Sequence, residues 1–489
     1  MGVFDVRHRT ATPGERLSPG WRLASARHAA PVVAALLIAA ALAGALVSLA
    51  MPSSPSYDPF AWLVWGRELT TPGQTFAVAG GPSWKPLPVL FTAPFALVGG
   101  SDAPALWLLV ARAGFLLALA GGWALAARLA GRWAAALTVG ALVLLGGLPS
   151  LALRGASEPL MLACVLWAIE RHLAGARRTA FALGVAATLV RPEAFAFVLV
   201  YAAWCWRGAR PRERWLLAGG IVLAPLLWLG PPALLGDALS PSHYAVAYQG
   251  ATGGNPGWTA LRRGLGLAVA PVWIFAALAV ALRPRDRVVW VLAAGAVAWL
   301  ALVAVMTMAG YPGLARFMLP AAVVACVLAG VGAVELARRL LPTRPPLGAA
   351  AVGVALATLL VVWAGPVATL GGQVREATRL GSMHEQLARA VAAAGGPAAI
   401  RACGTIATNG SAQTALAWQL GVPLARVAHR LATAGIAIVG PHSPELGATP
   451  AVPLRGARHR VVARAGVWRV VVVTGPAAPM PSGCRFAHA

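Results

Sequence analysis

Long uninterrupted apolar runs constrain this chain more than any other feature. Most are roughly 17 to 25 residues long and rich in Ala, Leu and Val, the length that an α-helix needs to cross a bilayer. Strands of a membrane barrel would instead alternate in polarity over about ten residues. Hydrophobic residues make up 59% of the 489 and charged residues 11%, with a mean hydropathy of +0.72, whereas a soluble domain is about one quarter charged. The sequence therefore predicts an all-α polytopic membrane protein.

These runs predict about eleven transmembrane helices. The first extends from Pro31 to Met51, and because it is long and lacks a clear small-residue cleavage site, we interpret it as a retained helix rather than a signal peptide. The segment 87–99 is short and is expected to be re-entrant or to lie along the interface. The later candidate spans, of which the fourth and fifth are short, are 103–127, 133–149, 156–173, 179–190, 193–206, 215–235, 264–282, 288–309, 314–337 and 347–369.

Positive charge is distributed unevenly between the connections, and this predicts the orientation. Residues 1–30 are polar and basic, which places the N-terminus in the cytoplasm. With sides alternating from there, the cytoplasmic connections and their flanks hold fifteen cations: Arg128, Arg132, Arg171, Arg177, Arg178, Arg207, Arg210, Arg212, Arg214, Arg283, Arg285, Arg287, Arg338, Arg339 and Arg344. The outer connections hold seven: Arg67, Lys85, Arg154, Arg191, Arg262, Arg263 and Arg316.

This bias follows the positive-inside rule and predicts a multi-pass protein of the bacterial plasma (inner) membrane. It also accounts for the net charge of +25 without nucleic acid as a partner, because the arginines punctuate the apolar runs instead of forming one basic domain. Membrane lipids are the expected surroundings.

A change in composition after residue 370 divides the chain into three parts. They are a cytoplasmic N-terminus (1–30), a transmembrane domain (31–370) and a C-terminal domain (371–489) that an eleventh crossing places outside the cytoplasm.

The C-terminal domain is predicted to be small and α/β. It contains a helix-like stretch at 382–394 and strand-like stretches at 460–463 and 468–474, with Gly and Pro turns between them. Its only cysteines, Cys403 and Cys484, are candidates for a disulfide in an oxidising compartment.

The first outer loop, residues 52–86, is the most informative stretch for chemistry. It is long, aromatic and polar, and its tryptophans Trp62, Trp65 and Trp84 are expected to face the lipid headgroups from short interfacial helices. An acidic residue, Asp58, follows the first span closely. Lys85, the only lysine in the sequence, stands at the end of the loop, and its survival among so many arginines suggests a need for lysine.

Asp58 followed by the run Lys85-Pro86-Leu87 resembles the first outer loop of membrane glycosyltransferases of the GT-C superfamily. The branch it resembles most closely is that of the protein mannosyltransferases and lipid A aminoarabinose transferases. In that family the loop Asp is the catalytic base, and a Lys-Pro-Pro-Leu motif places its lysine near the phosphate of a polyprenyl-phosphate sugar. This chain departs from the motif, with Leu87-Pro88 in place of Pro-Leu and Trp84 where a polar residue often precedes the lysine.

Three later segments extend the resemblance, which covers roughly residues 30–340. They are Arg154-Gly155-Ala156-Ser157-Glu158-Pro159-Leu160, Leu189-Val190-Arg191-Pro192-Glu193-Ala194, and Tyr311-Pro312 with Arg316-Phe317-Met318-Leu319-Pro320. The resemblance implies that Asp58 is the catalytic base and that Lys85, Arg191 and Arg316 bind the donor phosphate. The implied substrate pocket consists of Tyr57, Glu68, Trp84, Arg154, Glu158, Glu193 and Tyr311.

Glycosyl transfer needs a base for the acceptor hydroxyl and cations for the departing phosphate, and both are present on the outer side. Nucleotide sugars are cytoplasmic, so an outward-facing site implies a lipid-linked donor. We therefore expect an inverting glycosyltransferase that moves a sugar from a polyprenyl-phosphate donor to a glycan, lipid or protein acceptor of the envelope. No cofactor is expected to be required; a divalent metal is compatible with the sequence but is not expected, because outer carboxylates are few.

Structural roles are the alternatives for the same residues. Asp58 is also a suitable helix cap before a proline, and Lys85 a suitable interfacial anchor. Arg154 is also spaced to pair with Glu158, and Arg191 with its neighbour Glu193, while Arg316 suits an interfacial anchor.

Two other classes of protein remain as alternatives to an enzyme. One is a non-enzymatic lipid or polysaccharide transporter or flippase, although the sequence shows no evident internal repeat of the kind common in transporters. The other is an inactive scaffold that presents the C-terminal domain in an envelope assembly.

Overall fold

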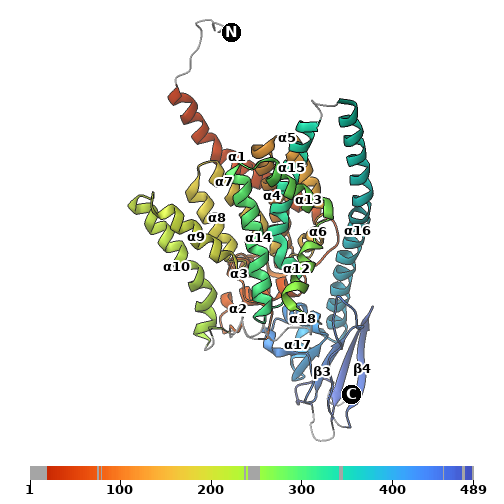
Figure 1. Cartoon of the computed structure of the whole chain (residues 1–489). Coiled ribbons are helices and arrows are strands. Elements are labelled where there is room, and N and C mark those ends of the chain that lie inside the picture. The colour runs from red at the N-terminus through yellow and green to blue at the C-terminus, as the bar shows by residue number, and fades with distance from the viewer. Residues whose placement is uncertain are drawn as a thin grey trace, which may run out of the picture.

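Helices form most of the molecule, and a small sheet domain lies at one end (Figure 1). The computed structural model describes residues 19–73, 76–78, 80–235, 238–239, 254–340, 345–454, 456–475 and 480–486, with side chains except at 19–30, 345–364 and 366. The predicted fold class, an all-α polytopic membrane protein with a small α/β C-terminal domain, is confirmed. The first part of the predicted basic N-terminus, residues 1–18, lies outside the described residues.

Each predicted span coincides with one helix or with two consecutive helices. These are α1 (Pro19–Ser48), α4 (Ala103–Ala130), α5 (Arg132–Val143), α6 (Leu148–Leu153), α7 (Glu158–Leu173), α8 (Arg177–Thr188), α9 (Ala194–Trp206), α10 (Pro211–Leu234), α12 (Pro256–Leu265), α13 (Ala270–Leu282), α14 (Arg287–Met308), α15 (Leu319–Leu340) and α16 (Pro345–Ala393). A 3-10 turn, η2 (Ala315–Met318), precedes α15.

Five helices in the described part of the chain are long and apolar enough to cross a bilayer. They lie at Pro31–Ser48, Gly100–Ala130, Pro211–Leu234, Arg287–Met308 and Ala315–Leu340, and α12 with α13, bent by 90°, add a sixth if the pair is one broken span. Helices α5 and α9 are apolar but shorter. The number of about eleven crossings stays a prediction.

Helix α15 lies at the centre of the bundle, with 83% of its apolar window buried. It packs against α5, α13 and α14. The approach to α5 and α13 is close because Gly330 and Gly332 face the backbone of Ala134 and Phe275, where a Cβ atom would clash. Small residues at such contacts allow helices in membranes to pack through their backbones.

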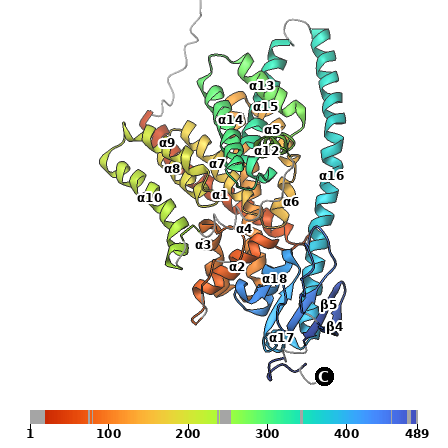
Figure 2. The same cartoon turned by 60° about the horizontal axis from the view of Figure 1, so that its bottom comes forward.

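Two short helices, α2 (Tyr57–Thr70) and α3 (Pro86–Val98), lie at the same end of the molecule as the sheet domain, and α1 begins at the opposite end (Figures 1 and 2). The expectation that Trp62, Trp65 and Trp84 face the headgroups is wrong, because they are only 1%, 0% and 3% exposed. They belong to a hydrophobic core that the loop shares with the C-terminal domain, so the domain covers the surface predicted to face lipid.

Helix α16 is continuous for 49 residues and crosses the predicted domain boundary at residue 370. The helix predicted at 382–394 is therefore the end of a much longer one. Its last turns pack on the sheet through Met383 and Leu387, which contact a core that includes Trp468.

The sheet has five strands in the order β2-β1-β3-β5-β4. Strands β4 (Arg458–Ala465) and β5 (Trp468–Thr474) contain the two predicted strands, and they pair antiparallel. The prediction missed β1 (Thr405–Thr408), β2 (Val427–Ala428) and β3 (Gly435–Val439), of which β1 pairs parallel with both others.

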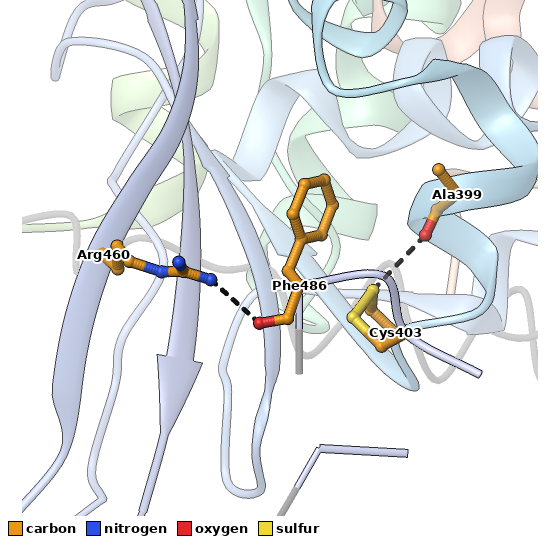
Figure 3. The surroundings of a disulfide bond; sticks show 5 residues. Ala399, Cys403, Arg460 and Phe486 are labelled. Carbon is orange, nitrogen blue, oxygen red and sulfur yellow. Dashed lines mark hydrogen bonds between the residues drawn. A yellow bond between two sulfur atoms is a disulfide. The ribbon is translucent and has the colours of Figure 1, made fainter. Parts of the chain in front are cut away.

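Two short helices and a disulfide complete the domain. Helix α18 (Gln413–Leu420) packs against α2, and α17 (Gly396–Arg401) follows α16. Cys403 and Cys484 form a disulfide that joins the start of the sheet to the C-terminal segment (Figure 3). Beside it, Arg460 of β4 donates a hydrogen bond to the carbonyl of Phe486.

Candidate active site

Five helix starts meet where the membrane part adjoins the C-terminal domain. Asp58 lies in the first turn of α2, Lys85 directly precedes α3, and Glu158 begins α7. Glu193 directly precedes α9, and Arg316 lies in η2 ahead of α15. The N-terminus of a helix presents unpaired N–H groups and a partial positive charge, so this arrangement favours an anion.

Glu158 is the centre of the cluster. Its side chain is 2% exposed, and one oxygen, Oε1, lies 3.0 Å from Nη2 of Arg191, 3.8 Å from Nζ of Lys85 and 3.8 Å from Nε of Arg316. A buried carboxylate is tolerated when cations and hydrogen bonds compensate it. The alternative in which Glu158 pairs with Arg154 is wrong, because Arg154 pairs instead with Glu376 of α16 at 2.9 Å.

Lys85 is buried, with its side chain 7% exposed. Its Nζ donates a hydrogen bond to Oγ of Ser157 (2.8 Å) and lies 5.1 Å from the centre of the Trp62 ring. Burial lowers the pKa of Lys85 to about 8, although Glu158 works in the opposite direction. An ammonium group held this way is a compact donor with hydrogen-bonding capacity left for an anion.

Asp58 is the more accessible carboxylate of the cluster. Its side chain is 18% exposed, and its Oδ2 accepts a hydrogen bond from Nη2 of Arg316 at 3.0 Å. Arg316 is 32% exposed and so links the accessible carboxylate to the buried one. A carboxylate that is reachable from outside and held by one arginine is suitable for accepting a proton from an entering hydroxyl.

Arg191 and Glu193 also pair with each other, at 3.3 Å. The guanidinium of Arg191 lies over the ring of Phe317, 3.8 Å from its centre. The cluster thus holds three cations and three carboxylates, so the positive and negative charges of its side chains are equal in number. A phosphate entering the cluster would compete with the carboxylates for the cations.

Four of the predicted pocket residues make described polar contacts outside the cluster. Two point to the C-terminal domain: Tyr57, whose hydroxyl donates to Gln413, and Arg154. Trp84 is buried and donates to the carbonyl of Leu227 in α10.

Glu68 lies ten residues along α2 from Asp58, about 15 Å at the rise of an α-helix. It accepts a hydrogen bond from the amide of Ala77, and burial raises its pKa to about 7. Tyr311, between α14 and η2, is half-buried.

The structure adds three residues that sequence reasoning did not assign to the cluster. Ser157 and Phe317 stand within the quoted motifs, next to Glu158 and Arg316, so their proximity was readable from the sequence. Trp62 was predicted to face the lipid interface instead. The sequence does not show whether a tryptophan in an outer loop packs against lipid headgroups or, as here, against the ammonium group of Lys85.

No group of three or more His, Cys, Asp or Glu side chains suited to hold a metal ion occurs among the residues that the structure describes. The carboxylates of the cluster are instead each within reach of an arginine.

Comparisons with known proteins identify the fold. No protein-family model matches the sequence, and no curated protein matches it. Among solved structures, the chain is similar to ArnT from Cupriavidus metallidurans, both bound to undecaprenyl phosphate and in the apo state. Each likeness has a TM-score of 0.54 at 19% identity and covers 92% of this chain, with 99% and 100% of those chains.

A likeness to the Archaeoglobus fulgidus oligosaccharyltransferase has a TM-score of 0.41 at 14% identity, over 69% of this chain and 55% of that chain, and is too weak to bear on the fold. The likeness to ArnT extends over nearly the whole of both chains, including the C-terminal domain. The chain therefore has the fold of ArnT, which is the GT-C fold that its motifs predicted.

Proposed function

We propose that this protein is an integral-membrane, inverting glycosyltransferase that uses a sugar linked to a polyprenyl phosphate on the outer side of the membrane. The observation that carries the proposal is the cluster itself: an accessible carboxylate, Asp58, lies beside three cations at the convergence of five helix starts. The fold supports it, because an ArnT structure of the same fold holds undecaprenyl phosphate.

In the proposed reaction Asp58 removes the proton from an acceptor hydroxyl. The oxygen attacks the anomeric carbon from the side opposite the phosphate, so the configuration inverts. The bond between the anomeric carbon and the phosphate oxygen breaks, and the phosphate leaves with the electron pair. Lys85 and Arg316 compensate the charge that develops on the phosphate.

The ion pairs of the cluster suggest how the donor activates the base. Arg316 pairs with both Asp58 and Glu158, so a phosphate that binds Arg316 competes with these two carboxylates. If Arg316 gives up Asp58, the Oδ2 lone pair is freed at the moment the donor is in place. This sequence of events would prevent Asp58 from acting before a donor is bound.

The test is transfer from a synthetic polyprenyl-phosphate sugar by the purified protein in detergent or nanodiscs. Formation of a glycosylated acceptor together with free polyprenyl phosphate supports the proposal. Transfer should persist in excess EDTA, because the proposal assigns the phosphate to cations of the chain itself, Lys85, Arg191 and Arg316. Movement of the intact lipid-linked sugar across a vesicle membrane, with no transfer to any envelope acceptor, would instead support the transporter.

A further inference from the structure

The C-terminal domain holds the helix that carries the candidate base. Helix α18 of this domain packs against α2 of the first outer loop, and hydrogen bonds join the two helices at both ends of α2. This requires an explanation, because Asp58 lies in the first turn of α2 and any displacement of that helix would move its carboxylate.

At the beginning of α2, two residues of α18 hold Tyr57, the residue next to Asp58. The Tyr57 hydroxyl donates to Oε1 of Gln413 at 2.9 Å, and the hydroxyl of Thr414 donates to the Tyr57 carbonyl at 2.8 Å. Gln413 is 4% exposed and Thr414 is 0% exposed, so water does not compete at either position.

The amide of Gln413 can be oriented in only one way. Its Nε2 donates to the carbonyls of Val427 (2.8 Å) and Leu424 (3.4 Å). A rotated amide would set its oxygen against these two carbonyls, so Oε1 must face the Tyr57 hydroxyl. The C-terminal domain thus presents a fixed acceptor.

At the far end of α2, Arg67 closes the end of α18. Its guanidinium donates to the carbonyls of Trp418 and Val422, both at 2.9 Å, and it lies over the Trp418 ring. These carbonyls are at the C-terminal end of α18, where a cation is favoured. The two helices are therefore clamped together at both ends.

We propose that Gln413 is a positioning residue for glycosyl transfer: by anchoring Tyr57, the C-terminal domain fixes the first turn of α2 and with it the carboxylate of Asp58. This inference rests on the proposed function. In this arrangement Gln413 acts through Tyr57, and without the C-terminal domain the membrane part would hold an imprecisely placed base. A small displacement of a reacting group is enough to lower a rate strongly.

The test compares Tyr57→Phe, Thr414→Val and Gln413→Met with Gln373→Met. The control is matched because Gln373 lies on α16 and accepts a hydrogen bond from the amide of Ser150 in α6, so it also joins the C-terminal region to the membrane part, but away from α2. We expect each of the three variants to lower kcat about tenfold, the scale of one hydrogen bond, with the KM for the donor within about twofold. The control should change neither.

Two readouts separate positioning from direct contact with substrate. If Gln413 acts through Tyr57, the losses in Tyr57→Phe and Gln413→Met are not additive, because both variants remove the same hydrogen bond. Amide hydrogen exchange in the peptide spanning 57–62 should also be faster in each variant than in Gln373→Met. Additive losses, or exchange in that peptide equal to the control, would overturn the proposal. If Gln413→Met does not fold, Tyr57→Phe removes the same hydrogen bond from its other end, and its exchange is compared with that of Gln373→Met.

Amide hydrogen exchange also distinguishes a failure of the positioning proposal from a failure of the proposed function. If the unmodified protein transfers no sugar from any polyprenyl-phosphate donor, the proposed function fails, while the exchange measurement still decides whether the C-terminal domain holds α2.

Discussion

At the scale of single residues, the site depends on two carboxylates in different surroundings. Glu158 is buried and surrounded by cations, whereas Asp58 is accessible and held by one arginine. The same functional group can therefore serve as a fixed counter-charge at one position and as a base at the other. The position of Asp58 near the surface of the cluster makes it the residue to test first.

We expect Asp58→Asn to lower transfer at least about a hundredfold, the usual contribution of a general base. The amide keeps the size of the side chain and can still accept from Arg316, but it cannot take a proton from the acceptor. Binding of undecaprenyl phosphate should not weaken, because the base faces the acceptor and the amide competes less strongly with the phosphate for Arg316. If transfer by Asp58→Asn remains near normal, Asp58 is a helix cap and the base lies elsewhere.

Lys85 gives the reaction a pH dependence. Its pKa of about 8 means that the ammonium is present below that pH and is lost as the pH rises through it. Affinity for undecaprenyl phosphate should therefore fall between about pH 7 and pH 9.5. In Lys85→Arg this decline should disappear, because a guanidinium stays charged, while Lys85→Ala should bind weakly at every pH. The measurement is a binding titration at constant ionic strength, and a decline that persists in Lys85→Arg would assign it to another group.

At the scale of elements, the sequence predicted the helices well and the C-terminal sheet poorly. Apolar runs mark membrane helices because no other structure satisfies the backbone in lipid. Strands β1 and β3 carry the short sequences Thr405–Thr408 and Gly435–Val439, which lie buried and do not alternate in polarity, so they resemble ordinary apolar loop sequence.

The candidate site was predictable in part, because several of its residues lie within short sequence motifs. Motif residues such as Glu158 and Arg191 stand at helix starts that topology brings to one end of the bundle. The partner of Arg154 was not predictable, since Glu376 is more than two hundred residues away on a helix whose length crosses the expected domain boundary. The Tyr57 contact with Gln413 was hidden for the same reason.

The disulfide should stabilise the C-terminal domain as an element. It joins positions 81 residues apart, and closing a loop of that size is worth about 4 kcal/mol in a chain-entropy model. We expect Cys403→Ser with Cys484→Ser to lower the unfolding temperature of the domain, with the loss also reproduced by a reductant. Non-reducing peptide mapping of membranes treated with a thiol-blocking reagent provides the control, and alkylated thiols at both positions would contradict the bond.

At the scale of the whole molecule, the first outer loop and the C-terminal domain lie at one end and the start of α1 at the other (Figures 1 and 2). Position 75 of the first outer loop lies outside the described residues, and the charge bias predicts its side. We expect cysteines introduced at positions 75 and 430 to react with an impermeant reagent in intact cells, and one at position 211 to react only after lysis. Labelling of 75 and 430 from opposite faces would refute both the predicted orientation and the contact between α2 and α18.

Because α16 is one continuous helix, its number of residues sets the angle at which the C-terminal domain meets the membrane part. Because 49 residues form one uninterrupted helix, about 74 Å long at the rise of an α-helix, each residue inserted between Gly371 and Gly372 turns everything beyond it by about 100° and moves it by about 1.5 Å. One inserted alanine should swing α18 away from α2 and abolish transfer. Seven inserted alanines, close to two full turns, should restore the angle but leave the domain about 10 Å too far out. Amide hydrogen exchange in the first turn of α2 should then be fast in both insertion variants. Protection of this turn in either variant would show that α16 bends or unwinds at the insertion and is not a rigid connection to the C-terminal domain.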